Sequence, residues 1–152
     1  MTINFEKYAQ TGKEFVKKVA FELGDNENTE KASRILRSTL HVLRELSTPE
    51  ESVQFISQLP MAIKAIYVDG WQPGRKKGRV RHADDFVAAM HKTHRKAYHD
   101  AKADEIDDFI DKHDCVQAVH SVFRVLKEYV SEGERNDFLL TLPEDLRNLF
   151  DD

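Results

Sequence analysis

Apolar residues recur every three or four positions along most of this chain, which is the spacing of an amphipathic α-helix. Such stripes cover residues 15–23, 29–46, 53–59, 63–67, 86–98 and 119–130. No stretch alternates apolar and polar residues long enough to predict a β-strand. The pattern therefore predicts an all-α protein.

Capping residues predict where several helices begin and end. A capping box places Thr or Ser at the N-cap and Glu three residues later. Thr11-Gly-Lys-Glu14 and Thr48-Pro-Glu-Glu51 both fit this rule. Pro60 disfavours helical angles in the residue before it, so a new helix is predicted to begin there. Gly24 and Gly70 are predicted to end helices.

The chain repeats its own pattern at an offset of 83 residues. The Leu-Pro pair ending at Pro60 recurs at Pro143, and the capping box at Thr48 recurs at Ser131. Buried-type positions match at the same offset: Ala32 and Cys115, Leu36 and Val119, Leu40 and Phe123, Leu43 and Leu126, Phe55 and Phe138, Ile63 and Leu146, Tyr67 and Phe150. This agreement predicts an internal duplication.

The duplication predicts two units of about four helices each, residues 1–74 and 83–152, joined by a linker at residues 75–82. Phe15-Val16 matches Phe86-Val87 at an offset of only 71, so the second unit carries 12 extra residues within residues 96–114. Ile106, Phe109 and Ile110 are helically spaced, so the insert is predicted to be helical. Each unit alone would have a marginal core, so we expect the two to pack as one body.

The linker contains the strongest charge feature of the chain, the basic residues Arg75, Lys76, Lys77, Arg79 and Arg81. Residues 1–74 carry a net charge of −1, the linker +5 and residues 83–152 −8. Five clustered cations could bind phosphate groups of a polyanion. The total of −4 argues against a nucleic-acid-binding protein, and we expect the linker to dock on its own acidic second unit.

Composition narrows the class of protein further. The chain has 152 residues, of which 40% are apolar and 33% charged, and its single cysteine excludes an internal disulfide. It lacks a signal-peptide pattern at residues 1–10 and a run of roughly 18 apolar residues. We therefore expect a cytoplasmic protein that is not inserted in a membrane.

Several of these segments resemble a known bacterial family. The segments are Phe15-Val16-x-x-Val19-Ala20, Arg34-Ile-Leu-Arg37-Ser-Thr-Leu40, Thr48-Pro-Glu-Glu51, Gln58-Leu-Pro60 and Tyr67-x-x-Gly70-Trp71-x-Pro73. They are similar to the family catalogued as domain of unknown function 2267. The resemblance implies an all-helical bacterial protein of two related halves and implies no activity. The second unit departs from the pattern, since Glu144-Asp145 replaces Met61-Ala62 and the Gly-Trp ending is absent.

Candidate metal ligands are His91, His94 and His99. His91 and His94 are three residues apart and share a helix face, so both could reach one metal ion. Their spacing matches no zinc motif, and the alternative is a polar helix face with His94 partly packed. The carboxylate pairs Asp84-Asp85 and Asp107-Asp108 are predicted to be solvated.

Two further positions could carry function. Cys115 follows His113-Asp114 but aligns with a buried stripe, so it is predicted to be a core residue and not a nucleophile. Trp71 follows an apolar helix that contains Tyr67, and this pair is a candidate partner-binding site because Trp is frequent at such sites. The alternative for Trp71 is a lid over the seam between the units.

The residues favour a helical interaction or structural module without enzymatic activity, and a homo-oligomer is possible. One alternative is polyanion binding through the linker, and another is metal binding at the histidines. No cofactor is predicted.

Overall fold

The computed structural model describes residues 2–74, 80–96, 108–109 and 111–150, and these residues form helices and no strand. The prediction of an all-α fold is confirmed. The helices are α1 (Phe5–Glu22), α2 (Thr29–Leu46), α3 (Pro49–Ile56), α4 (Met61–Val68), α5 (Ala83–Lys96), α6 (Lys112–Leu126), α7 (Glu132–Leu140) and α8 (Glu144–Arg147). Within the described residues, no helix is long and apolar enough to cross a membrane.

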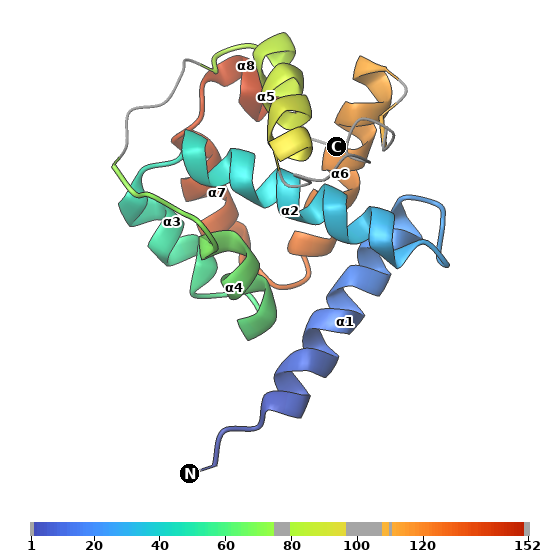
Figure 1. Ribbon diagram of the computed structural model, residues 1–152. Helices are drawn as coiled ribbons and strands as arrows, with labels where there is room; N and C mark the ends of the chain where they lie inside the picture. Colours follow the sequence, from blue (N-terminus) through green and yellow to red (C-terminus); the bar gives the residue numbers. More distant parts are fainter. Residues whose placement is uncertain (1, 75–79, 97–107, 110, 151–152) are drawn as a thin grey trace.

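Helix α2 lies at the centre of the molecule, where it contacts α1, α4, α5 and α6 (Figure 1). Asn28 caps its first turn by accepting a hydrogen bond from the Lys31 backbone N–H. Most side chains from Ala32 to Arg44 are buried, including the polar residues Ser38 and His41. A helix that is covered on several sides loses the polar face of an ordinary surface helix, so its buried polar side chains need partners inside the protein.

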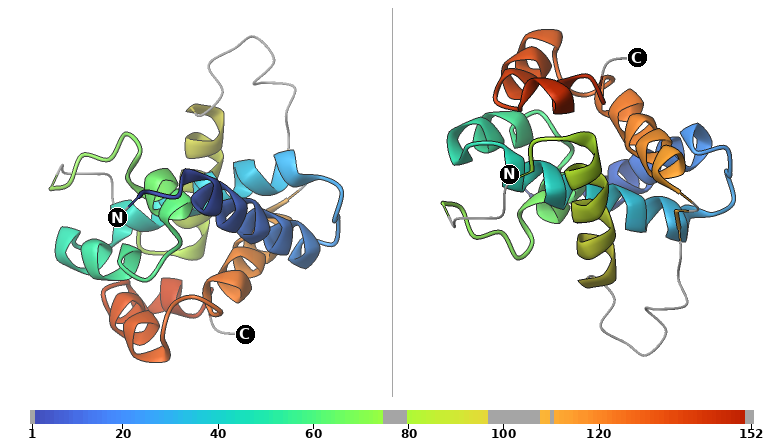
Figure 2. Two further views of the ribbon diagram at one scale, coloured as in Figure 1. Left: turned by 90° about the horizontal axis from the view of Figure 1, so that it is seen from below. Right: turned by 90° about the horizontal axis from the view of Figure 1, so that it is seen from above.

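The first and second halves of the chain share one hydrophobic core. Helix α1 packs against α6, α5 packs against α2, and α3 packs against α7. Figure 2 shows α7 beside α3 from two directions. At this contact the rings of Phe55 and Phe138 lie 4.6 Å apart between centroids. Aromatic contacts of this kind stabilise the interface beyond the area they bury.

Most predicted helix boundaries are confirmed. Thr48 and Ser131 are the N-caps of α3 and α7, and each side-chain oxygen accepts from the backbone N–H three residues later, over 3.2 and 3.3 Å. Pro60 and Pro143 are the N-caps of α4 and α8, with nearly identical backbone angles. Gly70, at a φ of +72°, follows the end of α4, and only glycine adopts this conformation at no steric cost.

The predicted start of the first helix at Thr11 is wrong. Helix α1 begins six residues earlier, at Phe5, where Asn4 caps it by accepting from the Lys7 N–H over 3.0 Å. The Thr11 hydroxyl instead donates to the Lys7 carbonyl over 2.8 Å, as threonine often does inside a helix. The prediction missed the first turns of α1 because they are exposed and carry no buried stripe.

The predicted helical insert lies mostly outside the described residues, and this includes Ile106 and Ile110. The described residues Asp108 and Phe109 are not helical. Both are nevertheless buried, and they lead into α6, whose N-cap is Asp111.

Three basic side chains on α2 bind the C-terminal end of α4. Arg44 donates from Nη1 to the carbonyls of Tyr67 and Asp69, both over 2.7 Å. His41 Nε2 donates to the Ile66 carbonyl over 2.8 Å, and Arg37 forms an ion pair with the Asp69 carboxylate at 2.9 Å. A helix C-terminus carries partial negative charge and unpaired carbonyls, so these donors stabilise the end of α4.

His41 should make the protein less stable as the pH falls below neutrality. Burial, with Arg44 and Arg37 nearby, lowers its pKa from 6.5 to about 4. The unfolded chain therefore binds a proton between pH 6.5 and 4 that the folded chain rejects, so stability falls across this window. The loss from this group is about 3 kcal/mol, at 1.36 kcal/mol per pKa unit.

His41→Gln keeps a side-chain donor for the Ile66 carbonyl and removes the titration. Urea unfolding at pH 7, 5.5 and 4 should show a smaller loss of stability in this variant than in the wild type, by about 3 kcal/mol at pH 4. Parallel pH profiles for the two proteins would contradict the role assigned to His41.

Candidate functional site

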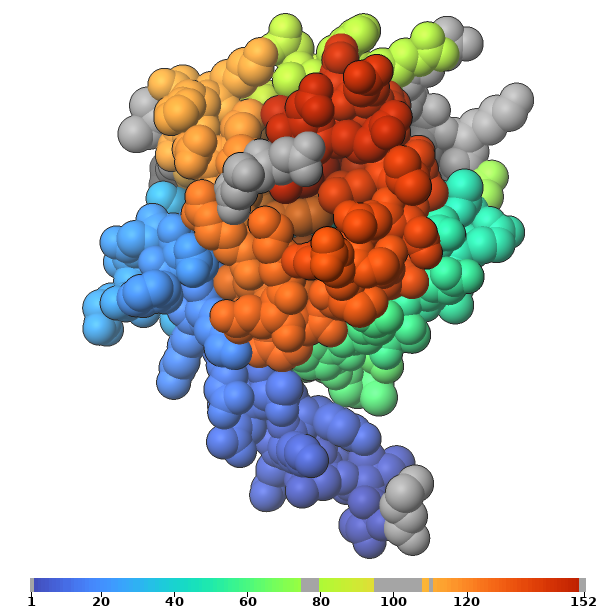
Figure 3. Space-filling view, turned by 180° about the vertical axis from the view of Figure 1, so that it is seen from behind, coloured from blue at the N-terminus to red at the C-terminus, as the bar shows by residue number. Residues whose placement is uncertain are grey.

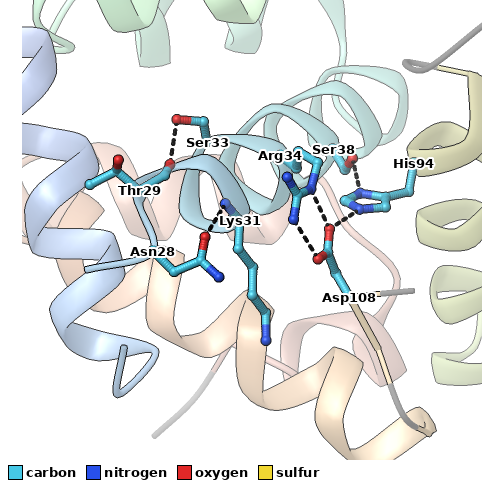
Figure 4. Close-up of polar contacts among 8 residues, drawn as sticks. All are labelled: Asn28, Thr29, Lys31, Ser33, Arg34, Ser38, His94 and Asp108. Atoms are coloured by element: carbon cyan, nitrogen blue, oxygen red, sulfur yellow. Dashed lines mark hydrogen bonds and ion pairs between the residues drawn. The ribbon is translucent and has the colours of Figure 1, made fainter. Parts of the chain in front are cut away.

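A buried polar network joins α2, α5 and the segment before α6 (Figure 4). Ser38 Oγ lies 2.7 Å from His94 Nδ1, and His94 Nε2 lies 2.6 Å from Asp108 Oδ2. Arg34 donates two hydrogen bonds to the same carboxylate, from Nε over 2.7 Å and from Nη2 over 2.8 Å. Planar paired contacts of this kind are the strongest form of the arginine–carboxylate interaction.

The protonation of this network follows from Asp108. Burial alone would raise the pKa of its carboxyl, but hydrogen bonds from Arg34 and His94 outweigh burial and hold that pKa well below its usual value. An ionised carboxylate only accepts hydrogen bonds, so His94 Nε2 carries a proton. In the neutral ring, Nδ1 then accepts a hydrogen bond from the Ser38 hydroxyl.

The hydrogen-bond chain from Ser38 through His94 to Asp108 links the same residue types as a serine hydrolase triad. The surroundings of Ser38, however, do not favour catalysis. Ser38 is 0% exposed and lies in the middle of α2, so its hydroxyl cannot contact a substrate. The backbone N–H groups around it serve the helix and cannot form an oxyanion hole. The network instead cross-links α2 to α5 and to Asp108.

The expected solvation of Asp108 is wrong, because its side chain lies in this network and the residue is only 8% exposed. Sequence reasoning missed the network because Arg34 and Asp108 are 74 residues apart. One signal in the sequence could have indicated a buried ion pair: the charged residue Arg34 lies within a stripe of core residues.

The histidines proposed as metal ligands have different surroundings. Both ring nitrogens of His94 lie within hydrogen-bond distance of protein partners. The ring of His91 packs edge-on against Phe109, with centroids 5.5 Å apart, and His99 lies outside the described residues. Among the residues that the structure describes, no group of three His, Cys, Asp or Glu side chains could hold a metal ion.

The predicted burial of Cys115 is confirmed, and its thiol is free. Burial, assisted by Asp114, raises the pKa of this thiol to about 12. A thiol in this state is a poor nucleophile because the reactive form is the thiolate.

Cys115 should therefore react slowly with a thiol reagent such as dithionitrobenzoate. In native protein at pH 8 we expect labelling roughly 100-fold slower than in denaturant, since both burial and a raised pKa oppose it. The measurement is absorbance against time in buffer and in urea. Rapid labelling of native protein would revive the nucleophile hypothesis.

The two residues proposed for partner binding lie at different depths. Tyr67 is fully buried, and its hydroxyl lies 2.7 Å from Ser52 Oγ, so its side chain belongs to the core. Trp71 is half-buried, and its ring packs edge-on against Tyr67 with centroids 6.0 Å apart. Only Trp71 of this pair is partly exposed.

Most of the predicted polyanion-binding residues, Arg75, Lys76, Lys77 and Arg79, lie outside the described residues. Arg81 is exposed, and its backbone N–H donates to the Asp85 carboxylate over 3.2 Å. Next to it, His82 Nδ1 lies 2.6 Å from Asp145 Oδ2 of α8. The described end of the linker thus contacts acidic residues of the second half.

The N-terminal segment and the first turns of α1 project from the body of the protein as an arm, defined here as residues 2–11 (Figure 3). Apart from the half-buried Tyr8 and Thr11, its residues are exposed. Phe5, near the end of the arm, is 72% exposed, and Ile3 is also exposed. Large apolar side chains on a projecting helix leave water only when another surface covers them.

An apolar groove of about 520 Å³ begins where the arm meets the body, between α1 and α4. We call it the α1–α4 groove. Its lining residues are Ala9, Gly12, Lys13, Val16, Lys17, Thr29, Ser33, Ala62, Ile63 and Ile66. The two helices touch closely at Gly12, since a Cβ atom there would lie 2.7 Å from the Cβ of Ala62. Lys13 and Lys17 are exposed and place positive charge at the groove.

The outer face of α4 is also apolar. Met61 and Val68 are 47% and 40% exposed, and Ala65 between them is exposed as well. The opposite side of α4 carries Ile63 and Tyr67, which are buried. Helix α4 is therefore apolar on both its inner and its outer side.

These features define the class of protein: an all-α protein with a buried polar network and an exposed apolar surface. The sequence profile of the family DUF2267, described as "Uncharacterized conserved protein", matches residues 12–149. The chain belongs to this family. A search of curated proteins found no match.

Proposed function

We propose that this protein is a helical interaction module without enzymatic activity, and that it binds a helix in the α1–α4 groove. The observation that carries the proposal is the outer face of α4. Exposed apolar side chains gathered on one helix face often mark a binding surface, and Met61, Ala65 and Val68 form such a face on α4. An amphipathic helix docking in an apolar groove would cover them, with its apolar residues spaced three and four apart.

The corresponding helix of the second half supports this choice of surface. Helix α8 follows Pro143 as α4 follows Pro60, but it exposes Glu144 and Asp145. At the offset of 83 residues Glu144 takes the place of Met61, which supports the view that folding does not require an apolar outer face here. The apolar face of α4 is thus better explained by binding than by folding.

Selection of displayed helical peptides on the purified protein tests the proposal. Enriched peptides should share apolar residues at helical spacing and acidic residues that complement Lys13 and Lys17. We expect dissociation constants on the order of 10 µM, as for a small interface. Ala9→Arg, which places a charge in the groove at an exposed position, should abolish binding.

The matched control is Val53→Arg, which changes an exposed apolar residue of α3. This variant should bind the peptides like the wild type. Equal loss in both variants, or peptides without helical spacing, would overturn the proposal.

Binding of a polyanion by the linker is the alternative that its charge of +5 favours. We expect DNA and RNA to bind weakly and to dissociate at physiological salt, since the second half is strongly acidic and competes for the linker. Replacing all five basic residues of the linker with serine should leave the circular dichroism spectrum and melting temperature unchanged. Submicromolar binding at physiological salt that this variant loses would promote the alternative.

We also propose that the chain arose by internal duplication and acts in the cytoplasm of a bacterium. The matching caps at Thr48 and Ser131 support the duplication. So does the reciprocal packing of α1 on α6 and of α5 on α2. An experimental structure in which α1–α4 and α5–α8 superimpose by a twofold rotation would agree with it, and unrelated helix directions would contradict it.

A further inference from the structure

We infer that the helix bound by the α1–α4 groove is the arm of a second copy of this chain. Two α1 helices would then pair in antiparallel orientation, and each arm would lie in the groove of the other copy. This inference rests on the proposed function, because it names the occupant of the same groove. Two features of α1 carry it: an apolar stripe and the charges beside that stripe.

The stripe continues from the groove to the end of the arm. Phe5, Ala9, Gly12 and Val16 are spaced by four, three and four residues, so they share one face of α1. The last three line the groove, and Phe5 extends the same face past the body. Phe5 and Ala9 are the exposed part of this face, since Val16 is half-buried and Gly12 is buried against Ala62. This exposed part is apolar, as an apolar groove requires of a helix that it binds.

The charges beside the stripe complement one another in an antiparallel pair. Glu6, Lys13 and Lys17 are exposed and lie on the same side of the stripe, since seven and eleven residues are close to whole numbers of turns. A twofold axis brings equal sides of two antiparallel helices together. If Phe5 lies over Val16 of the other copy, Glu6 lies between its Lys13 and Lys17. Parallel pairing would lack this match.

Phe5 and Val16 are eleven residues apart, which is roughly 17 Å along a helix. Twofold pairing of this segment would bury both copies of Phe5, which is 72% exposed in the single chain.

Sedimentation velocity of the full-length chain over a range of concentrations tests the inference. We expect a monomer–dimer equilibrium. Phe5→Ser should raise the dissociation constant about tenfold or more, because it removes a buried aromatic anchor. The matched control is Phe21→Ser, on the same helix and 66% exposed, which should leave the equilibrium unchanged. A monomer at all concentrations, or equal effects of both variants, would overturn the inference.

Charge reversal distinguishes the proposed dimer from non-specific association. Glu6→Lys alone, and Lys13→Glu with Lys17→Glu, should each weaken the dimer several-fold. Combining all three should restore it, because the opposite charges meet again. Failure of the triple variant to recover would overturn the antiparallel arrangement.

Repeating the peptide selection on the Phe5→Ser variant separates the two proposals. If the wild-type chain is monomeric and peptides still bind its groove, the proposed function is supported and the inference of a dimer is contradicted. A dimer that depends on Phe5, and that these peptides dissociate, would support both.

Discussion

Asp108→Asn should lower the free energy of unfolding by about 3–5 kcal/mol, the range expected when one partner of a buried ion pair is removed. The substitution removes the carboxylate charge that Arg34 contacts, and it replaces an acceptor oxygen of the network by an amide that donates. Arg34 and His94 both direct donors at that position. Chemical denaturation at pH 7 measures the change.

The matched control is Asp69→Asn, which breaks the exposed ion pair with Arg37. Exposed pairs contribute about 0–1 kcal/mol, so this variant should be nearly as stable as the wild type. Similar losses in the two variants would contradict the distinction between the buried and exposed pairs.

The pH dependence of the Asp108 effect has a defined sign. Because the folded pKa is lowered, the carboxylate stabilises the folded state above the unfolded pKa of about 3.9. That contribution is lost as the pH falls below about 4. The difference in unfolding free energy between the wild type and Asp108→Asn should therefore shrink as the pH falls below about 4.

Leu40→Ala and Phe123→Ala should each destabilise the protein by about 2–5 kcal/mol, with the phenylalanine change in the upper part of that range. Leu40 is fully buried in α2. The ring of Phe123 stacks on Phe150 at a centroid distance of 4.2 Å. Each truncation leaves a cavity in the core that both halves share.

Thermal unfolding of these variants also tests whether the halves form one cooperative unit. We expect a single transition in the wild type, and both variants should shift the whole of it to lower temperature. Two separate transitions, with Leu40→Ala moving one and Phe123→Ala moving the other, would contradict a common core.

Features that depend on neighbouring residues could be predicted from the sequence alone. Helical spacing marked the buried stripes, and the caps at Thr48 and Ser131 placed two helix starts correctly. The burial of Cys115 followed from its position on such a stripe. These predictions succeed because capping and amphipathic spacing act within one or two helical turns. The start of α1 was missed because an exposed helix end needs no buried stripe.

Features that depend on how helices are placed against one another were decided only by the tertiary structure. The ion pair of Arg34 with Asp108 joins residues that no local pattern connects. The sequence likewise did not reveal that α1 would extend past its neighbours, or that Gly12 would touch Ala62 and border a groove. Local periodicity determines which side of a helix is apolar, whereas the packing of all the helices determines which apolar surface is left in water.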